Sequence, residues 1–330
     1  MRTLRALAAT FSLTMVLTLS GCEQGEPPVA SEQVADRGLF SAALSHDGNY
    51  ALIGSLQHGG SLWKTDSFER IFNWNHEAGA FTPITVSAIT GHGRFALTVE
   101  SDRMVLWNSV DGRALTFFSA PANVLDAALG PDGRYALLGL SDTNAVLFDA
   151  KKGGIKRTFH TDGRVWSVAL DASGSLALTG GEDEIARLWD VESGTEKQRW
   201  EHNNEIRGVA LSEDGSLALT IAKYDRAAVW DTQSGLLVGR LPQSRWRLVR
   251  GEVFTTAAIS SDNKYILTGT TARDVHLFEM PGPRLVKTWS LSKTENWKRS
   301  AASVIAVGFT ETDGNFIAIS ADGYLHRLKQ

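Results

Sequence analysis

The chain has 330 residues, of which 43% are hydrophobic and 21% charged, and its formal net charge is −4. This is the composition of an ordinary globular protein long enough to bury a large core, and the mildly acidic balance gives no global sign of nucleic-acid binding. The 10 Trp and 31 Gly residues suit an all-β repeat protein.

Residues 1–21 have the features of a targeting segment. Two basic residues, Arg2 and Arg5, precede an uncharged apolar run from Ala6 to Leu19. This run is too short to span a bilayer comfortably and has the length of a signal-peptide core. It ends in the sequence LSGC at residues 19–22, which resembles the lipobox of bacterial lipoproteins. The alternative is an ordinary secretory signal followed by a chance cysteine.

The lipobox resemblance implies that residues 1–21 are removed and that Cys22 becomes the acylated first residue. Cys22 is the only cysteine, so the chain forms no internal disulfide. Several acyl chains anchor a protein stably, whereas one chain is marginal. In the best-studied sorting rule of such lipoproteins, an Asp after the cysteine retains the protein at the inner membrane. Here that residue is Glu23, which favours the outer membrane facing the periplasm, with the inner membrane possible.

The mature chain is expected to begin with a short tether over residues 22–28, followed by one domain over residues 29–330. The stretch Glu23–Pro28 is acidic and contains proline, and six extended residues reach only about 20 Å.

A turn followed by an alternating strand recurs along this domain. The repeated stretches are HDGNYALIG from His46, GHGRFALT from Gly91, PDGRYALLG from Pro131, SGSLAL from Ser173, EDGSLALT from Glu213, SDNKYILTG from Ser261 and TDGNFIAI from Thr312. After each turn, a further predicted strand ends in a large apolar residue, at Trp63, Trp107, Phe148, Trp189, Trp230, Phe278 and Leu328. Period-two alternation bounded by Gly, Ser and Asp predicts half-buried strands joined by tight turns.

These units recur at roughly 40–50 residues, within the period range of propeller blades. Here the chain resembles the WD-repeat family, and the resemblance covers nearly everything after residue 28. It implies an all-β fold, a seven-bladed β-propeller of four-stranded antiparallel blades. The chain stops at Gln330, directly after a third strand. We therefore expect Val29–Gln33 to supply the outer strand of the last blade, the alternative being a disordered linker.

The fourth repeat, from His160 to Trp200, is most similar to the family pattern. The resemblance implies a structural hydrogen-bonded set of His160, Thr179, Asp183 and Trp189. A buried indole N–H and an imidazole need partners, and a carboxylate in a tight turn can fix the imidazole tautomer. A His/Asp pair could also serve catalysis, but such pairs often belong to structural networks.

Two connections between blades are longer than the others, PQSRWRLVRGE over Pro242–Glu252 and SKTENWKRSAAS over Ser292–Ser303. Both link an outer strand to the next inner strand, so both should lie on one face at adjacent blades. Each places a Trp among cations, and Trp and Arg are enriched at interface hot spots. The candidate partner-binding residues are Arg245, Trp246, Arg247, Arg250, Lys293, Trp297, Lys298 and Arg299. The alternative is that both Trp residues pack against blade edges among solvated cations.

The sequence contains no phosphate loop, metalloprotease motif, nucleophile elbow or Cys/His ligand cluster, so we assign no catalytic residue, metal or cofactor. The predicted inner strands carry only two charges, Asp126 and Arg207, which are too few for an acid–base pair with a substrate clamp. We expect a non-enzymatic interaction scaffold, a monomeric propeller that binds one or more protein partners through one propeller face within a complex. The alternatives are a cell-wall or glycan-binding lipoprotein that stacks sugars on Trp246 and Trp297, and a propeller enzyme with a site in its channel.

Overall fold

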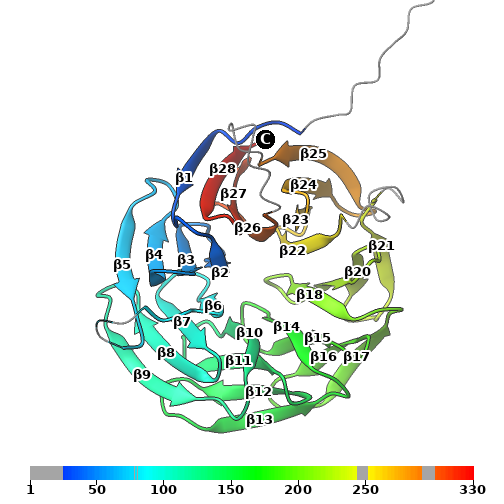
Figure 1. The fold of residues 1–330 in the computed structure, drawn as a ribbon. Helices are drawn as coiled ribbons and strands as arrows, with labels where there is room; N and C mark the ends of the chain where they lie inside the picture. The colour runs from blue at the N-terminus through cyan, green and yellow to red at the C-terminus, as the bar shows by residue number, and fades with distance from the viewer. Residues whose placement is uncertain (1–24, 78, 80, 244–251, 292–301) are drawn as a thin grey trace, which may run out of the picture.

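The computed structural model describes residues 25–330 except 78, 80, 244–251 and 292–301. The described residues form seven four-stranded antiparallel sheets arranged in a ring, a seven-bladed β-propeller, as predicted (Figure 1). Among them, no helix is long and apolar enough to cross a bilayer.

Each blade has the same order of strands from the centre of the ring outward. The innermost strands are β2 (Leu39–Leu44), β6 (Val86–Ile89), β10 (Val124–Leu129), β14 (Val165–Leu170), β18 (Ile206–Leu211), β22 (Phe254–Ile259) and β26 (Val304–Phe309). The second strands are β3 (Tyr50–Ser55), β7 (Phe95–Glu100), β11 (Tyr135–Leu140), β15 (Leu176–Gly181), β19 (Leu217–Ala222), β23 (Tyr265–Thr270) and β27 (Asn315–Ser320).

The third strands are β4 (Gly59–Lys64), β8 (Arg103–Asn108), β12 (Asn144–Asp149), β16 (Ile185–Asp190), β20 (Ala228–Asp231), β24 (Asp274–Glu279) and β28 (Tyr324–Lys329). The outer strands are β5 (Arg70–Trp74), β9 (Ala114–Ser119), β13 (Ile155–His160), β17 (Glu196–Glu201), β21 (Leu237–Arg240), β25 (Arg284–Ser290) and, for blade seven, β1 (Ala30–Gln33).

The ring is closed by its N-terminal strand, as the sequence predicted. Strand β1 pairs antiparallel with β28, with Ala30 opposite Arg327 and Gln33 opposite Tyr324. The imidazole of His326 adds a side-chain link, because its Nδ1 lies 2.7 Å from Oγ of Ser31. Strand β1 covers the edge of β28, so the outer edge of blade seven is a short strand of four residues.

The recurring turns have the backbone conformation that their sequences favour. Gly174, in the turn between β14 and β15, has φ of +72°, a conformation that costs an L side chain about 1–2 kcal/mol. In the equivalent turn of blade six this position is Asn263, with φ of +59°. Asn tolerates this region better than most residues, which explains why that turn forms without glycine.

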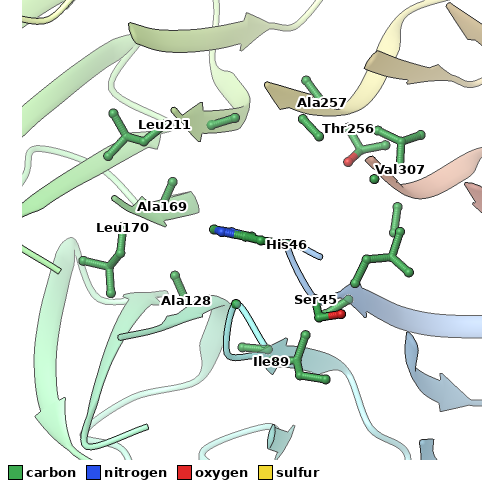
Figure 2. A pocket seen from close by; sticks show the side chains of 18 of the residues that line it. Ser45, His46, Ile89, Ala128, Ala169, Leu170, Leu211, Thr256, Ala257 and Val307 are labelled. Atoms are coloured by element: carbon green, nitrogen blue, oxygen red, sulfur yellow. The ribbon is translucent and has the colours of Figure 1, made fainter. Parts of the chain in front are cut away.

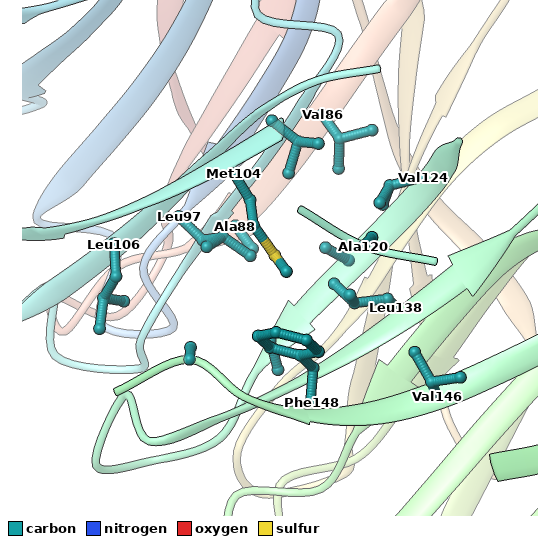
Figure 3. Packing of buried hydrophobic residues seen from close by; sticks show 14 of the residues in the cluster. Val86, Ala88, Leu97, Met104, Leu106, Ala120, Val124, Leu138, Val146 and Phe148 are labelled. Atoms are coloured by element: carbon teal, nitrogen blue, oxygen red, sulfur yellow. The ribbon is translucent and has the colours of Figure 1, made fainter. Parts of the chain in front are cut away.

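The core is divided among the interfaces between blades rather than gathered at one centre. Seven buried hydrophobic clusters each join neighbouring blades. Between blades two and three, Met104 and Leu106 of β8 pack with Leu138 and Phe148 of the next blade (Figure 3). A single blade cannot bury both its faces, so each depends on its neighbours for stability.

Candidate functional site

Antiparallel alternation gives the ring two chemically different faces. Every connection from an outer strand to the next inner strand, and every turn from a second to a third strand, lies at the same end of its blade. We call this end the connection face and the opposite end the turn face. The two long connections run from β21 to β22 and from β25 to β26, so their ends lie on the connection face at neighbouring blades.

The tips of these connections lie outside the described residues. This applies to all eight candidate partner-binding residues: Arg245, Trp246, Arg247, Arg250, Lys293, Trp297, Lys298 and Arg299. Cys22 also lies outside them. The described base of the first connection is closed by a hydrogen bond of 2.7 Å, which Nε2 of Gln243 donates to the carbonyl oxygen of Glu252.

The connection face also carries an exposed apolar patch on blades one and two that the sequence analysis did not identify. We define it as Phe40, Leu56 and Phe81, of which Phe81 is 69% exposed. The ring of Phe81 lies edge-on to His58, with centroids 5.9 Å apart. The amide of Leu56 donates to the carbonyl of Gly38, two residues before Phe40, which holds both residues at this end of blade one. Phe40 follows the first residue of an inner strand, and an aromatic residue at that position is the signal that could have indicated it.

An aromatic–cation pair lies at the mouth of the central opening on the same face. The guanidinium of Arg207, from β18, lies 4.2 Å from the ring centroid of Trp166, from β14. Arg207 also pairs with Glu205. The indole N–H of Trp166 has no hydrogen-bond partner within the described residues. Trp and Arg held in this way form a rigid contact surface, and both residue types are enriched at interface hot spots.

The central channel has a volume of about 790 Å³ and is lined by the inner strands of all seven blades. Its lining is mostly small or aliphatic, with Ala128, Ala169 and Ala257 facing the opening, and the imidazole of His46 projects toward its centre (Figure 2). On the inner strands, the charged residues that line it are Asp126 and Arg207.

Asp126 is part of a hydrogen-bonded chain between blades. One carboxylate oxygen accepts from Oγ of Ser167 at 3.0 Å and from the amide of Val168 at 2.9 Å, and the other accepts from the amide of Ala127 at 2.9 Å. The hydroxyl oxygen of Ser167 accepts from the amide of Val209 in the next blade. Burial raises the pKa of Asp126 to about 6, against the lowering effect of these donors. With three donors bound, this carboxylate joins blades three and four, and Ser167 extends the chain to blade five.

In blade four, two of the four residues in the predicted hydrogen-bonded set are joined. Nε1 of Trp189 donates to Oγ1 of Thr179 at 3.0 Å, and both side chains are buried. The prediction for His160 is wrong. Its Nδ1 lies 2.8 Å from Oδ1 of Asn144, and its side chain is exposed. Strand alternation explains this, because the adjacent Phe159 faces the core and His160 therefore faces outward.

The prediction that Asp183 pairs with an imidazole is also wrong, because a guanidinium occupies that role. Arg187, whose side chain is only 2% exposed, pairs with the carboxylate of Asp183. It also pairs with Asp162 at 3.0 Å and with Glu196 at 3.3 Å. One buried cation therefore holds three carboxylates from the turn, the preceding connection and the outer strand of the blade.

A His–Thr–Trp arrangement does occur, in blade two. Nε1 of Trp107 donates to Oγ1 of Thr98 at 2.8 Å, and Nε2 of His76 lies 2.9 Å from the same oxygen. Burial lowers the pKa of His76, which favours the neutral imidazole. His76 lies in the connection that precedes its blade, 22 residues before Thr98, whereas His160 lies 19 residues before Thr179. A search at one fixed spacing therefore misses His76.

One group of described residues has the ligand types of a metal site. Glu252, Asp274 and His276 place one ligand atom each within 4.8 Å of one another. Asp274 already accepts a hydrogen bond from Oγ of Ser290 at 2.7 Å, and Nδ1 of His276 lies 2.9 Å from Oγ1 of Thr288. These bonds engage Asp274 and His276 within blade six.

The family model described as WD domain, G-beta repeat, matches residues 154–190, which run from the end of blade three through most of blade four. A comparison with curated proteins gives no match. The matched repeat and the seven-bladed ring together support the WD-repeat β-propeller family.

Proposed function

We propose that this protein is a bacterial envelope lipoprotein, acylated at Cys22, whose propeller binds another protein through its connection face without catalysing a reaction. WD-repeat propellers are commonly interaction scaffolds, and the repeat match and the fold support a scaffold role on this ground. The envelope location and the lipid anchor rest on the LSGC sequence at residues 19–22.

The observation that carries the proposal is the chemistry of the connection face. It exposes the apolar patch of Phe40, Leu56 and Phe81, together with the stacked pair of Trp166 and Arg207. Exposed apolar and aromatic side chains on one face of a domain are typical of an interaction site. The described ends of the connections that carry Trp246 and Trp297 lie on the same face. Cations on these connections would suit an acidic segment of a partner.

The channel supports an enzyme less well. Its two inner-strand charges are engaged separately, Asp126 by three donors and Arg207 by Glu205 and Trp166. A general acid or base must reach a proton on the substrate, and a carboxylate committed to backbone and serine donors is poorly placed to do so.

Site-specific photo-crosslinking in intact cells tests the partner-binding face. A photo-reactive residue replaces Phe81, Trp246 or Trp297 in turn, with Phe117 on the outer edge of blade two as a matched aromatic control. We expect the same protein adduct from Phe81 and from at least one of the two Trp positions, and none from Phe117. Equal adducts at Phe117, or none from any connection-face position in a folded protein, would reject this face. Capture of the protein by peptidoglycan fragments alone would favour the glycan-binding alternative.

Mass analysis of the N-terminal peptide tests the anchor. We expect an acylated Cys22, and a Cys22→Ser variant that retains its signal peptide or leaves the membrane fraction. A mature chain with a free Cys22 thiol would reject the lipoprotein assignment.

A further inference from the structure

The N-terminal chain is fixed to the propeller before it reaches β1. The amide of Glu26 donates to the carbonyl of Thr288 at 2.9 Å, and the amide of Ser290 donates to the carbonyl of Glu26 at 2.9 Å. These two bonds make a parallel bridge between Glu26 and Trp289 in β25, the outer strand of blade six. The chain then crosses to blade seven, where β1 pairs with β28 (Figure 1).

Side chains reinforce this attachment. Nζ of Lys287 lies 2.8 Å from a carboxylate oxygen of Glu26. A Cβ atom at Gly25 would lie 2.8 Å from the amide nitrogen of Ser290, so only glycine fits there without displacing the backbone. The described part of the tether predicted over residues 22–28 is therefore held on blade six rather than free.

This attachment limits how far blade six can lie from an anchor at Cys22. Gly25 is three residues after Cys22, and a fully extended chain of that length spans about 10 Å. Acyl chains on Cys22 would therefore bring the end of β25 close to the lipid headgroups.

The outer edge around β25 has the side chains of a membrane-contacting surface. Leu285 and Val286 of β25 are 44% and 38% exposed, and Val29, between the Glu26 bridge and β1, is 68% exposed. Arg284 and Lys287 flank the two apolar residues in the same strand, and they pair with Glu279 and Glu26. Exposed apolar side chains on this edge suit contact with the acyl chains at the membrane boundary.

Exposed apolar residues alone would not select this edge. The outer strand of blade two, on the far side of the ring, exposes Leu115 and Phe117 at 41% and 60%. What distinguishes β25 is the N-terminal chain attached to it.

We propose that the outer edge formed by Val29, Leu285 and Val286 rests on the phospholipid surface and holds the propeller edge-on to the membrane. The proposal rests on acylation of Cys22 and deepens the proposed function. In this orientation neither the connection face nor the turn face lies against the bilayer, so a partner can reach the channel mouth from the side.

The absence of any cysteine other than Cys22 makes a direct test possible, since an introduced cysteine is the only free thiol in the acylated protein. The acylated full-length mature V286C protein is spin-labelled and reconstituted in vesicles of phosphatidylethanolamine and phosphatidylglycerol. F117C is the matched control, because position 117 is also an exposed apolar position on an outer strand. Collision rates with oxygen and with a water-soluble nickel chelate report the depth of each label.

We expect the ratio of oxygen to nickel collision rates at position 286 to be severalfold higher than at position 117. In the Cys22→Ser form of V286C, measured in solution without detergent, this ratio should fall to the control value. Equal ratios at both positions in an acylated protein would overturn the edge-on orientation and leave the lipoprotein assignment intact. A mass showing Cys22 unmodified in cells would overturn both, and it is read independently of the spin label.

Discussion

Replacing the buried Arg187 by leucine should be among the most destabilising single changes to a charged residue of blade four. Arg187 is buried and holds Asp183, Asp162 and Glu196. Removing one partner of a buried ion pair costs about 3–5 kcal/mol, because the remaining charge stays buried without compensation. Asp162 and Glu196 can regain water, since their side chains are 78% and 30% exposed. Asp183 cannot, so we expect a loss near the lower end of that range.

The matched control is His160→Ala. The imidazole of His160 is exposed and bonded only to Asn144 within the described residues, so its removal should cost less than about 0.5 kcal/mol. Arg187→Lys keeps one positive charge but cannot present a guanidinium fork to three carboxylates, and should fall between the two.

Urea unfolding followed by tryptophan fluorescence and far-UV circular dichroism measures the three variants against the parent protein. A double variant of Arg187 and Asp183, both to leucine, should recover part of the loss, because it removes the stranded charge with its partner. If His160→Ala lowers the midpoint as much as Arg187→Leu, the buried-guanidinium reasoning is refuted and the imidazole set implied by the sequence is restored.

Three further changes test the ring closure, the core and the turns by urea unfolding. Burial lowers the pKa of His326 from 6.5 to about 4, so between these pH values only the unfolded chain gains a proton. The free energy of unfolding should therefore fall as the pH drops through this range, by at most about 3 kcal/mol. His326→Gln should remove this part of the pH dependence, and an unchanged profile would contradict it. Leu138→Ala, at a fully buried position between blades two and three, should cost about 2–5 kcal/mol, and a loss under about 1 kcal/mol would show that the interface relaxes. Gly174→Ala should cost about 1–2 kcal/mol through backbone strain, because φ is +72° there, and no change in midpoint would contradict that conformation.

The sequence predicted the ring because its signals are local. Turn residues such as Gly174 and the alternating strands on either side of them indicate each meander over a short stretch of sequence. Seven such units were found, and the last lacked an outer strand, which the sequence analysis assigned to Val29–Gln33. The local pair of Thr179 and Trp189 was predicted correctly for the same reason, since neighbouring strands in a hairpin bring them together.

The partners of Asp183 and the position of the tether were decided only by tertiary structure. Whether an imidazole or a guanidinium reaches Asp183 depends on which side of β13 and β16 each residue faces, and the inward position of Phe159 turns His160 away while Arg187 lies buried beside the carboxylate. The acidic, proline-containing residues before β1 have no periodic pattern, so nothing local shows that Glu26 binds the edge of blade six. That contact forms between segments about 260 residues apart in the sequence, and only closure of the ring brings them together.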